Sequence, residues 1–223
     1  MYQTSDFYSA PDGSLVLKKG VPDMSAHAAS TVRPGFVKYK DLDGDGVITT
    51  EDRTIIGNGQ PDFFGGFTNT FNFYGVDLSF MLQFSVGNDV YNAQRMYNTQ
   101  TKLENMNLLA EVNDRWTATN ASNEVPSSTG YVSYDVYSRF IEDGSYLRLK
   151  NITLGYTLPD KWMRKIYVSK LRFYATLQNL FCLTNYKGYD PEVSSLSSNL
   201  MPSFDYGAYP RSRVYTFGVE LKF

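Results

Sequence analysis

The chain has 223 residues and a formal net charge of -2 at pH 7, a balance without a basic stripe that argues against nucleic acid as a partner. Its one cysteine, Cys182, excludes an intrachain disulfide and a cysteine-based zinc site, and its one histidine, His27, excludes a histidine-rich metal site.

Two classes of β-protein fit the rest of the composition. No apolar run approaches the roughly 20 residues of a transmembrane helix. The stretch "MYQTSDFYSAPDG" has neither a basic region nor an apolar core, so we expect no signal peptide in it. Aromatic residues make up 16% of the chain, against a background of Asn, Ser, Thr and Gly. This mixture suits β-structure with one apolar face, either a secreted β-sandwich or an outer-membrane barrel with aromatic girdles.

The first predicted region, residues 1–62, is a loop region with an acidic loop at residues 41–52, "DLDGDGVITTED". In a calcium loop, oxygen ligands at the first, third, fifth, seventh and twelfth positions wrap one hard cation. Here these ligands would be Asp41, Asp43, Asp45, the Val47 carbonyl and Asp52. Gly46 permits the sharp turn at the sixth position, and Ile48 is expected to anchor the loop in apolar packing.

Calcium is the expected ion, ahead of magnesium. Four carboxylates held this close repel each other unless a cation is present. The last position is Asp rather than the usual Glu, which resembles dockerin-type loops more than sensor EF-hands and puts bidentate closure in question. A dockerin needs two such repeats and the chain has one, so a cohesin-binding role is disfavoured. A metal-free acidic turn is the alternative.

A long β-hairpin is predicted for residues of about 63–87. Apolar side chains occupy every second position of its second half: Val76, Leu78, Phe80, Leu82, Phe84 and Val86. About 11 residues suffice to cross a bilayer as a tilted strand, whereas soluble strands average about 5–6. Residues 67–73 alternate in the same way, and Tyr74 and Gly75 form a tight turn between the two runs because glycine readily adopts positive φ.

Three further strands are predicted in residues 145–159, 170–181 and 211–223, where apolar residues again alternate with polar ones. In the first of these runs, Leu147 and Leu149 have the opposite parity to Ile152 and Leu154. This change predicts a β-bulge or a change of environment near Lys150.

Connection lengths predict how the strands are arranged. The turn at 74–75 and the connection at about 159–168 are short, whereas residues 88–144 and 183–209 are long and polar. Outer-membrane barrels have short periplasmic turns and long extracellular loops. The sequence therefore predicts an all-β fold in which residues 63–223 supply about five antiparallel strands of a transmembrane β-barrel. With the C-terminal strand ending in the periplasm, residues 1–62 and the two long loops are extracellular.

The sequence predicts no enzyme. Glu142 and Asp143 are adjacent in a strand and point to opposite faces, so they do not flank one bond. One histidine and one cysteine offer no convincing Ser-His-Asp or Cys-His arrangement. The rival from another class is a secreted, calcium-stabilised β-sandwich that binds glycan or protein.

Four stretches between about residue 34 and residue 223 follow a family pattern: "PGFVKYKDLDGDGVITTEDRTIIGNGQPDFFGGFTNTF", "SRFIEDGSYLRLKNITLGYTLP", "LRFYATLQNLFCLTNYKGYDPEVS" and "YTFGVELKF". In these stretches the chain resembles the C-terminal part of SusC/RagA-type TonB-dependent outer-membrane transporters of Bacteroidetes. Residues 1–33 and 93–135 carry no such motif.

The resemblance implies a role in import. Members of the family pass oligosaccharides, or sometimes peptides, through a plugged barrel of about 22 strands. A SusD-like lipoprotein caps the outer face, and the inner-membrane TonB complex pulls on an N-terminal box. Plug, box and signal peptide are missing from this sequence, and five strands leave two edges that hydrocarbon does not tolerate. We therefore expect a fragment of a Gram-negative outer-membrane protein that does not transport alone.

Two residue sets are candidates for contacts with partners. The first set consists of four loop aromatics, Tyr186, Tyr189, Tyr206 and Tyr209. They could stack on sugars, contact the SusD-like lid or pack the loop onto itself. A terminal aromatic with alternating apolar residues looks like the signal read by the barrel assembly machinery, and it comprises Tyr215, Phe217, Val219, Leu221 and Phe223.

Overall fold

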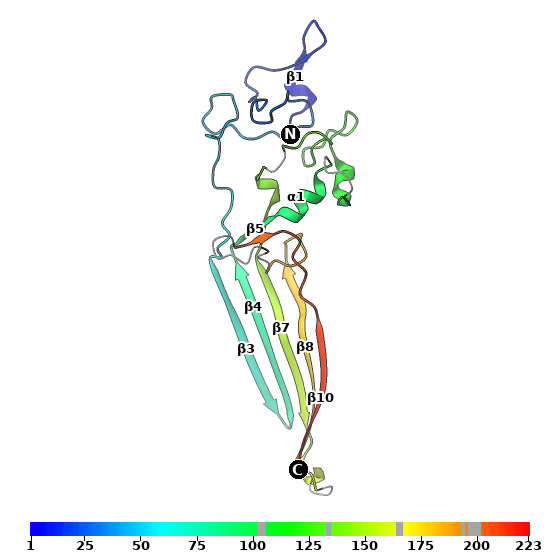
Figure 1. Cartoon of the computed structure of the whole chain (residues 1–223). Coiled ribbons are helices and arrows are strands. Elements are labelled where there is room, and N and C mark those ends of the chain that lie inside the picture. The colour runs from blue at the N-terminus through cyan, green and yellow to red at the C-terminus, as the bar shows by residue number, and fades with distance from the viewer. Residues whose placement is uncertain (102–105, 133–134, 164–166, 193–194, 196–201) are drawn as a thin grey trace. The chain divides into compact units, whose positions relative to one another are not determined.

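The computed structural model describes residues 1–101, 106–132, 135–163, 167–192, 195 and 202–223 (Figure 1). Their contacts divide the chain into two compact units. One unit combines Met1–Ile56 with Ala93–Phe140, and the other combines Gly57–Asn92 with Ile141–Phe223. Each unit is thus built from two segments that are far apart in the sequence.

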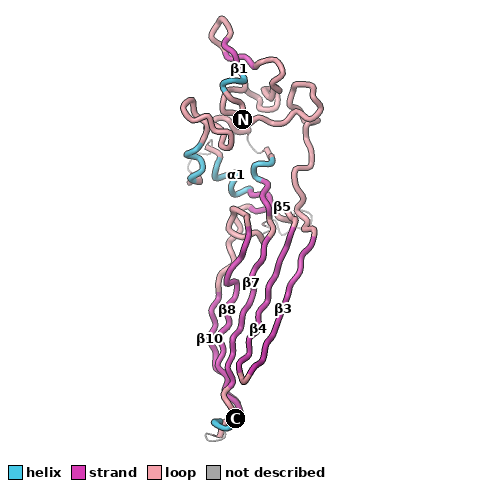
Figure 2. The backbone as a smooth tube through the Cα atoms, turned by 180° about the vertical axis from the view of Figure 1, so that it is seen from behind, coloured by secondary structure: helices cyan, strands magenta, loops and turns pink. Residues whose placement is uncertain are grey.

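Five long strands form one antiparallel sheet in the second unit (Figures 1 and 2). In chain order they are β3 (Phe63–Phe73), β4 (Val76–Val86), β7 (Tyr146–Thr157), β8 (Lys170–Thr184) and β10 (Val214–Lys222). Their order across the sheet is β10-β8-β7-β4-β3. This confirms the predicted set of about five antiparallel strands. Among the described strands, β3 and β10 each have one neighbour, so the sheet is open at both edges.

The hairpin between β3 and β4 forms as predicted. Its register runs from Phe63 opposite Val86 to Phe73 opposite Val76, without a break. Tyr74 and Gly75 both have positive φ, 47° and 83°. Two positive-φ residues are typical of the turn that matches the right-handed twist of two paired strands.

The sheet has one apolar and one polar face. On the apolar face, the ring of Phe80 lies 6.1 Å from that of Phe67 and 6.3 Å from that of Phe71. On the polar face, Arg172 donates to both carboxylate oxygens of Asp77, at 2.9 and 2.6 Å. Apolar side chains are largely exposed, with Leu154 at 53% and Phe217 at 78%. The described residues thus supply no second layer that covers this face, unlike the core of a β-sandwich.

A β-bulge interrupts β7 where the parity of its apolar residues changes, as predicted. The register with β8 shifts between Leu149 and Asn151, and Lys150 lies in the gap. On β8 the same gap contains Asn179, whose φ is 52°. The bulge keeps Leu149 and Ile152 on one face although three positions separate them.

A small sheet and a short helix complete the second unit. The sheet contains β5 (Asp89–Asn92), β6 (Ile141–Asp143) and β9 (Phe204–Asp205), in the order β6-β5-β9. The helix is α2 (Asp160–Met163), in the short connection after β7. Parts of the predicted long loops 88–144 and 183–209 therefore have regular structure. Residues 102–105, 133–134, 193–194 and 196–201 of those loops lie outside the described residues.

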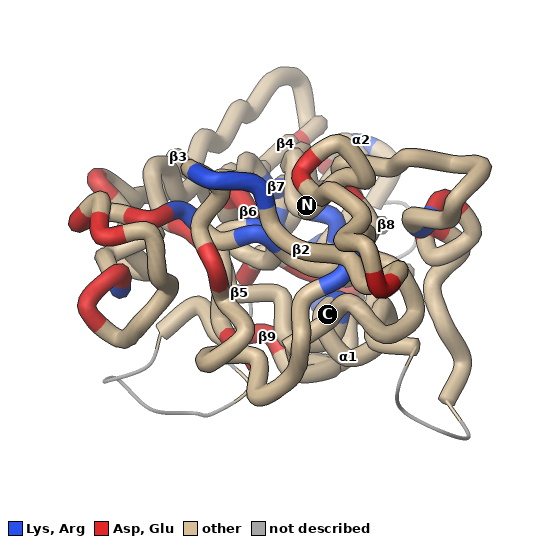
Figure 3. Tube along the Cα trace, turned by 90° about the horizontal axis from the view of Figure 1, so that it is seen from above, with Lys and Arg blue, Asp and Glu red and all other residues tan. Residues whose placement is uncertain are grey.

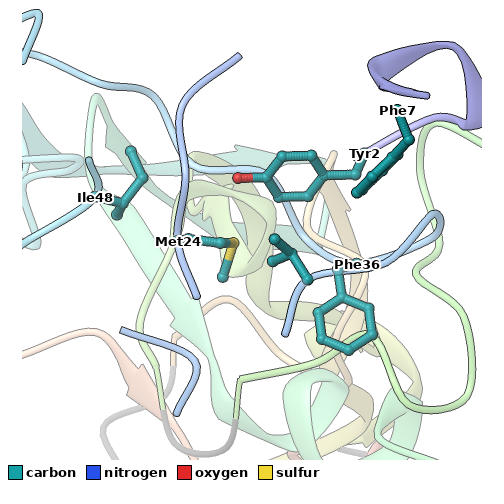
Figure 4. Packing of buried hydrophobic residues seen from close by; sticks show 6 residues of the cluster. Tyr2, Phe7, Met24, Phe36 and Ile48 are labelled. Atoms are coloured by element: carbon teal, nitrogen blue, oxygen red, sulfur yellow. The ribbon is translucent and has the colours of Figure 1, made fainter. Parts of the chain in front are cut away.

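The first unit contains short elements and a small apolar core. They are η1 (Thr4–Asp6), β1 (Phe7–Ser9), β2 (Leu15–Leu17), α1 (Ala93–Thr99), η2 (Ala110–Asp114) and η3 (Ser138–Phe140). The buried core residues are Tyr2, Phe7, Met24, Val32, Phe36 and Ile48, most of them labelled in Figure 4. In the part of the chain that the structure describes, no helix is both long and apolar enough to cross a membrane.

Candidate functional site

The acidic loop at residues 41–52 brings three of its predicted ligands together. Asp41, Asp43 and Asp45 each offer a carboxylate oxygen, and these oxygens lie within 4.8 Å of one another. Backbone amides hold them in place: Asp41 accepts from Gly44 at 2.6 Å and from Gly46 at 2.9 Å. The backbone amide of Asp45 donates to the Asp43 carboxylate at 3.0 Å, and the backbone amide of Val47 donates to the Asp45 carboxylate at 2.7 Å. The chemistry of this donor set suits a hard divalent cation.

Asp52, the predicted ligand at the twelfth position, caps the loop. Its Oδ1 accepts from Leu42 at 2.7 Å, and its Oδ2 accepts from Thr49 at 2.8 Å. The backbone hydrogen bonds from Thr49 and Leu42 hold the pKa of this carboxyl below its ordinary value. Asp52 lies outside the group of three aspartates, so its part in binding an ion stays a prediction.

The loop is fixed to the core of the first unit through Ile48. This side chain is 2% exposed and belongs to the core cluster. The amide of Ile48 donates to the Asp23 carbonyl at 2.8 Å, and the Asp23 amide donates to the Gly46 carbonyl at 2.9 Å. Gly46 has a φ of 86°, which suits glycine at the sharp turn. The predicted anchor is therefore present, and it holds the loop in one conformation next to the predicted carbonyl ligand, Val47.

The four loop tyrosines fall into two groups. Tyr186 is 6% exposed and donates a hydrogen bond to Asp205 at 2.6 Å. Burial, together with this bond, raises the pKa of its hydroxyl well above the usual value. Tyr189, Tyr206 and Tyr209 are exposed at 74%, 55% and 90%. Of the four tyrosines, these three are the exposed ones, whereas Tyr186 fixes its own segment.

An ionic cluster lies at the first residues of β7. Along the chain as a whole, acidic and basic positions are interspersed (Figure 3). Arg148 pairs with Asp190, and each side chain is 5% exposed. Lys150 pairs with Glu192 at 2.8 Å, and Arg211 pairs with the same carboxylate at 3.0 Å. We call these five residues the ionic cluster. The sequence alone did not reveal these pairs, because the acidic partners in "YDPEV" follow the next strand.

Comparisons with known proteins give a consistent result, although no family model matches the chain. TonB-dependent receptor P3 of Formosa agariphila is 36% identical over 211 residues, which cover 91% of this chain and 20% of the receptor. TonB-dependent receptor SusC of Bacteroides thetaiotaomicron is 31% identical over 83% of this chain and 17% of the receptor. A solved structure of the RagAB peptide transporter matches 79% of this chain with a TM-score of 0.69 and 28% identity.

The chain belongs to the SusC/RagA family of TonB-dependent receptors. It spans about a fifth of the length of these relatives, and 19% of the RagAB chain that it matches. Its family consists of receptors and transporters rather than enzymes. The fold is therefore a segment of an outer-membrane β-barrel, and the alternative of a secreted sandwich is wrong.

In this SusC/RagA-family chain, β10 presents the predicted assembly residues on one face. Tyr215, Phe217, Val219 and Leu221 alternate along the strand, and all of them are exposed, as is Phe223 directly after it. The strand pairs with β8 from Val214 to Lys222, and no other described strand pairs with its second edge. This arrangement suits the predicted signal, which remains a prediction.

Proposed function

We propose that this chain supplies wall strands and outer loops of a TonB-dependent importer that takes up oligosaccharides across the Gram-negative outer membrane. The observation that carries the proposal is the two-faced sheet in a chain of the SusC/RagA family. An 11-residue strand such as β4 spans roughly 36 Å, and a tilt of about 40° reduces this to about 28 Å. That height is close to the apolar band of about 25 Å on such barrels.

Oligosaccharide is the proposed substrate class because of the exposed tyrosines in the segment after β8. Tyr189, Tyr206 and Tyr209 offer ring faces together with hydroxyl groups. An aromatic ring packs on the apolar face of a sugar while its polar tip remains hydrated. Peptide is the other candidate, since the RagAB neighbour is a peptide transporter.

The proposed partners follow from family membership. A SusD-like lipoprotein would cap the outer face, and the TonB complex would act through a part of the receptor that lies outside this sequence. The barrel assembly machinery would read the strand that includes Tyr215 and Phe217. Lipid would contact the apolar face of the sheet, where Leu154 is exposed.

The uptake experiment uses cells that lack the gene for the receptor carrying this chain. The wild-type gene should restore uptake of fluorescent oligosaccharides that depends on TonB, and Tyr189→Ala should raise the half-saturating concentration. Tyr167→Ala is the matched control, because Tyr167 is exposed and lies in the short connection after β7. Restoration of peptide uptake alone would overturn the oligosaccharide proposal and leave the importer proposal standing.

We also infer that the acidic loop binds Ca²⁺ and so orders an extracellular loop. Three carboxylate oxygens within 4.8 Å of one another support this. Asp41→Ala should lower calcium affinity, measured by calorimetry, and should increase proteolysis of the loop without unfolding the barrel. Glu51→Gln is the control, because it removes a carboxylate of the same loop outside the group of three. Equal calcium binding by both variants would reject the site.

A further inference from the structure

The starting observation is a buried arginine with two acidic neighbours. Arg148 is 4% exposed and lies on the polar face of β7, opposite Cys182 on β8. Its guanidinium pairs with Asp190, and its Nε lies 3.5 Å from the Glu192 carboxylate. The Glu192 amide donates to Asp190 at 2.9 Å, so the two acidic residues form one rigid turn.

The bulge adds a second cation to the same carboxylates. Lys150, which lies in the register gap of β7, donates to both oxygens of Glu192, at 3.1 and 2.8 Å. Gln83 on β4 donates to the same carboxylate at 3.5 Å and to the Tyr146 hydroxyl at 2.9 Å. Two strands of the sheet thus hold the turn that contains Asp190 and Glu192.

A second anchor lies four residues earlier in the chain. The buried hydroxyl of Tyr186 donates to Asp205, and the Lys187 amide donates to Glu142 at 3.0 Å. A Cβ on Gly188 would collide with the Tyr186 ring, so the backbone passes directly over that ring. Between the two anchors, Tyr189 is 74% exposed. We call residues 186–192 the clamped segment.

We propose that the ionic cluster clamps this segment onto the polar face of the sheet, and that Arg148 and Asp190 are positioning residues for a ligand contact made by Tyr189. The ligand would present an apolar face to the ring, as a sugar ring does. The ligand in this proposal rests on the proposed import function. The clamp itself rests on the structure alone.

A positioning role explains the cluster better than a contribution to net stability. Desolvation offsets most of the attraction within a buried ion pair. Apolar residues of the same size would therefore stabilise the fold at least as much as the ion pair does. An ion pair differs from them in specifying one geometry, because each hydrogen bond has a direction. Fixing both ends of the clamped segment lowers the entropy that Tyr189 loses when it contacts a ligand.

Cys182 is a native reporter of the clamp. It is half-buried and faces the same side as Arg148, its partner across the β7–β8 ladder. The experiment measures the labelling rates of this thiol with N-ethylmaleimide and with a polymer-linked maleimide, in the full receptor. Both reagents react with the thiolate form of Cys182, so both rates are proportional to the fraction of thiolate. A change in that fraction therefore cancels in the ratio of the two rates. The ratio reports only whether a bulky reagent has access.

The expected result is a rise in the polymer-to-small-reagent ratio on the order of tenfold for Asp190→Asn, since an unpaired buried charge favours local opening. Glu220→Gln is the matched control. Glu220 pairs with Lys170 at 3.0 Å on the polar face, and both side chains are partly exposed. A ratio that stays at the wild-type value in Asp190→Asn overturns the clamp. If that variant does not fold, the milder Glu192→Gln decides by the same criterion.

A second readout separates positioning from general stability. Asp190→Asn should raise the half-saturating concentration for uptake and leave the maximal rate unchanged. Combined with Tyr189→Ala, it should add nothing to the effect of Tyr189→Ala alone, because it acts through that ring. Additive losses would overturn the positioning role. An absence of uptake by the wild-type receptor would reject the import function, whereas the Cys182 ratio would still test the clamp.

Discussion

Substitution of Leu154 by lysine tests whether the apolar face of the sheet contacts lipid. Leu154 lies opposite Leu78, three residues from the centre of β4. Three residues correspond to roughly 10 Å along the strand, or about 8 Å in depth at a tilt of about 40°. The hydrocarbon core extends about 15 Å from its centre, so this position is well inside it.

The two environments predict different costs for Leu154→Lys. In lipid, a lysine at this depth should cost about 2 kcal/mol, between the midplane and interface values for barrels. This corresponds to about a 30-fold shift in the unfolding equilibrium. In water, the 53% exposure of Leu154 would keep the change within about 0.5 kcal/mol. Thr216→Lys is the control, because it adds the same charge to the exposed polar face of β10 at nearly the same level.

The assay is urea unfolding of the receptor in phospholipid bilayers, followed by the gel mobility of the folded barrel. We expect a lower midpoint for Leu154→Lys and a midpoint near wild type for Thr216→Lys. Equal midpoints for the two variants would refute the assignment of the apolar face to lipid.

Two further predictions concern backbone geometry and pH. Gly75→Ala should destabilise the β3–β4 hairpin by about 1–3 kcal/mol in the same unfolding assay, because φ is 83° and a Cβ would lie 2.6 Å from the Thr157 carbonyl oxygen. Gly13→Ala is the control, because Gly13 has a φ of 82° and open space around an added Cβ, so this variant has the backbone strain without a steric collision. An equal loss of stability in Gly13→Ala would contradict a role for the collision at Gly75. Since the pKa of Asp52 is lowered in the fold, its stabilisation of the loop is present above the ordinary aspartate pKa of about 4 and is lost as pH falls through the lower, folded value. Amide exchange of Leu42 and Thr49 should accelerate in that acidic range, and Asp52→Asn should abolish the acceleration.

The barrel strands were predictable because one physical constraint acts on every second residue. Lipid on one face and water on the other impose period-two alternation, and this alternation located β3, β4, β7, β8 and β10. The same alternation indicated an irregularity at Lys150, where the change of parity fitted a bulge or a change of environment, and the structure shows the bulge. The turn at Gly75 followed from the chemistry of glycine.

Contacts between distant segments were not predictable. Asp190 lies 42 positions after Arg148, and no periodicity connects a loop residue with a strand that precedes it. In the same way, the Trp116 indole donates to Gln3 at 3.1 Å across 113 positions in the first unit. Ile48 is different, since its place in the acidic loop predicts an anchor although its partners Tyr2 and Met24 were not foreseen.

The three clustered aspartates differ in their hydrogen bonds to the acidic loop, and this difference leads to a final prediction. Asp41 accepts amide hydrogen bonds on both oxygens, whereas Asp43 and Asp45 each accept from a backbone amide through Oδ1 alone among the described residues. Asp41 therefore organises the loop before an ion arrives, whereas Asp43 and Asp45 are each held by one amide hydrogen bond among the described residues. Asp43→Asn should weaken calcium binding and leave amide exchange of the calcium-free loop unchanged. Asp41→Asn should accelerate that exchange at Gly44 and Gly46 as well as weaken binding. Identical exchange in the two variants would show that the loop takes its form from the ion rather than from Asp41.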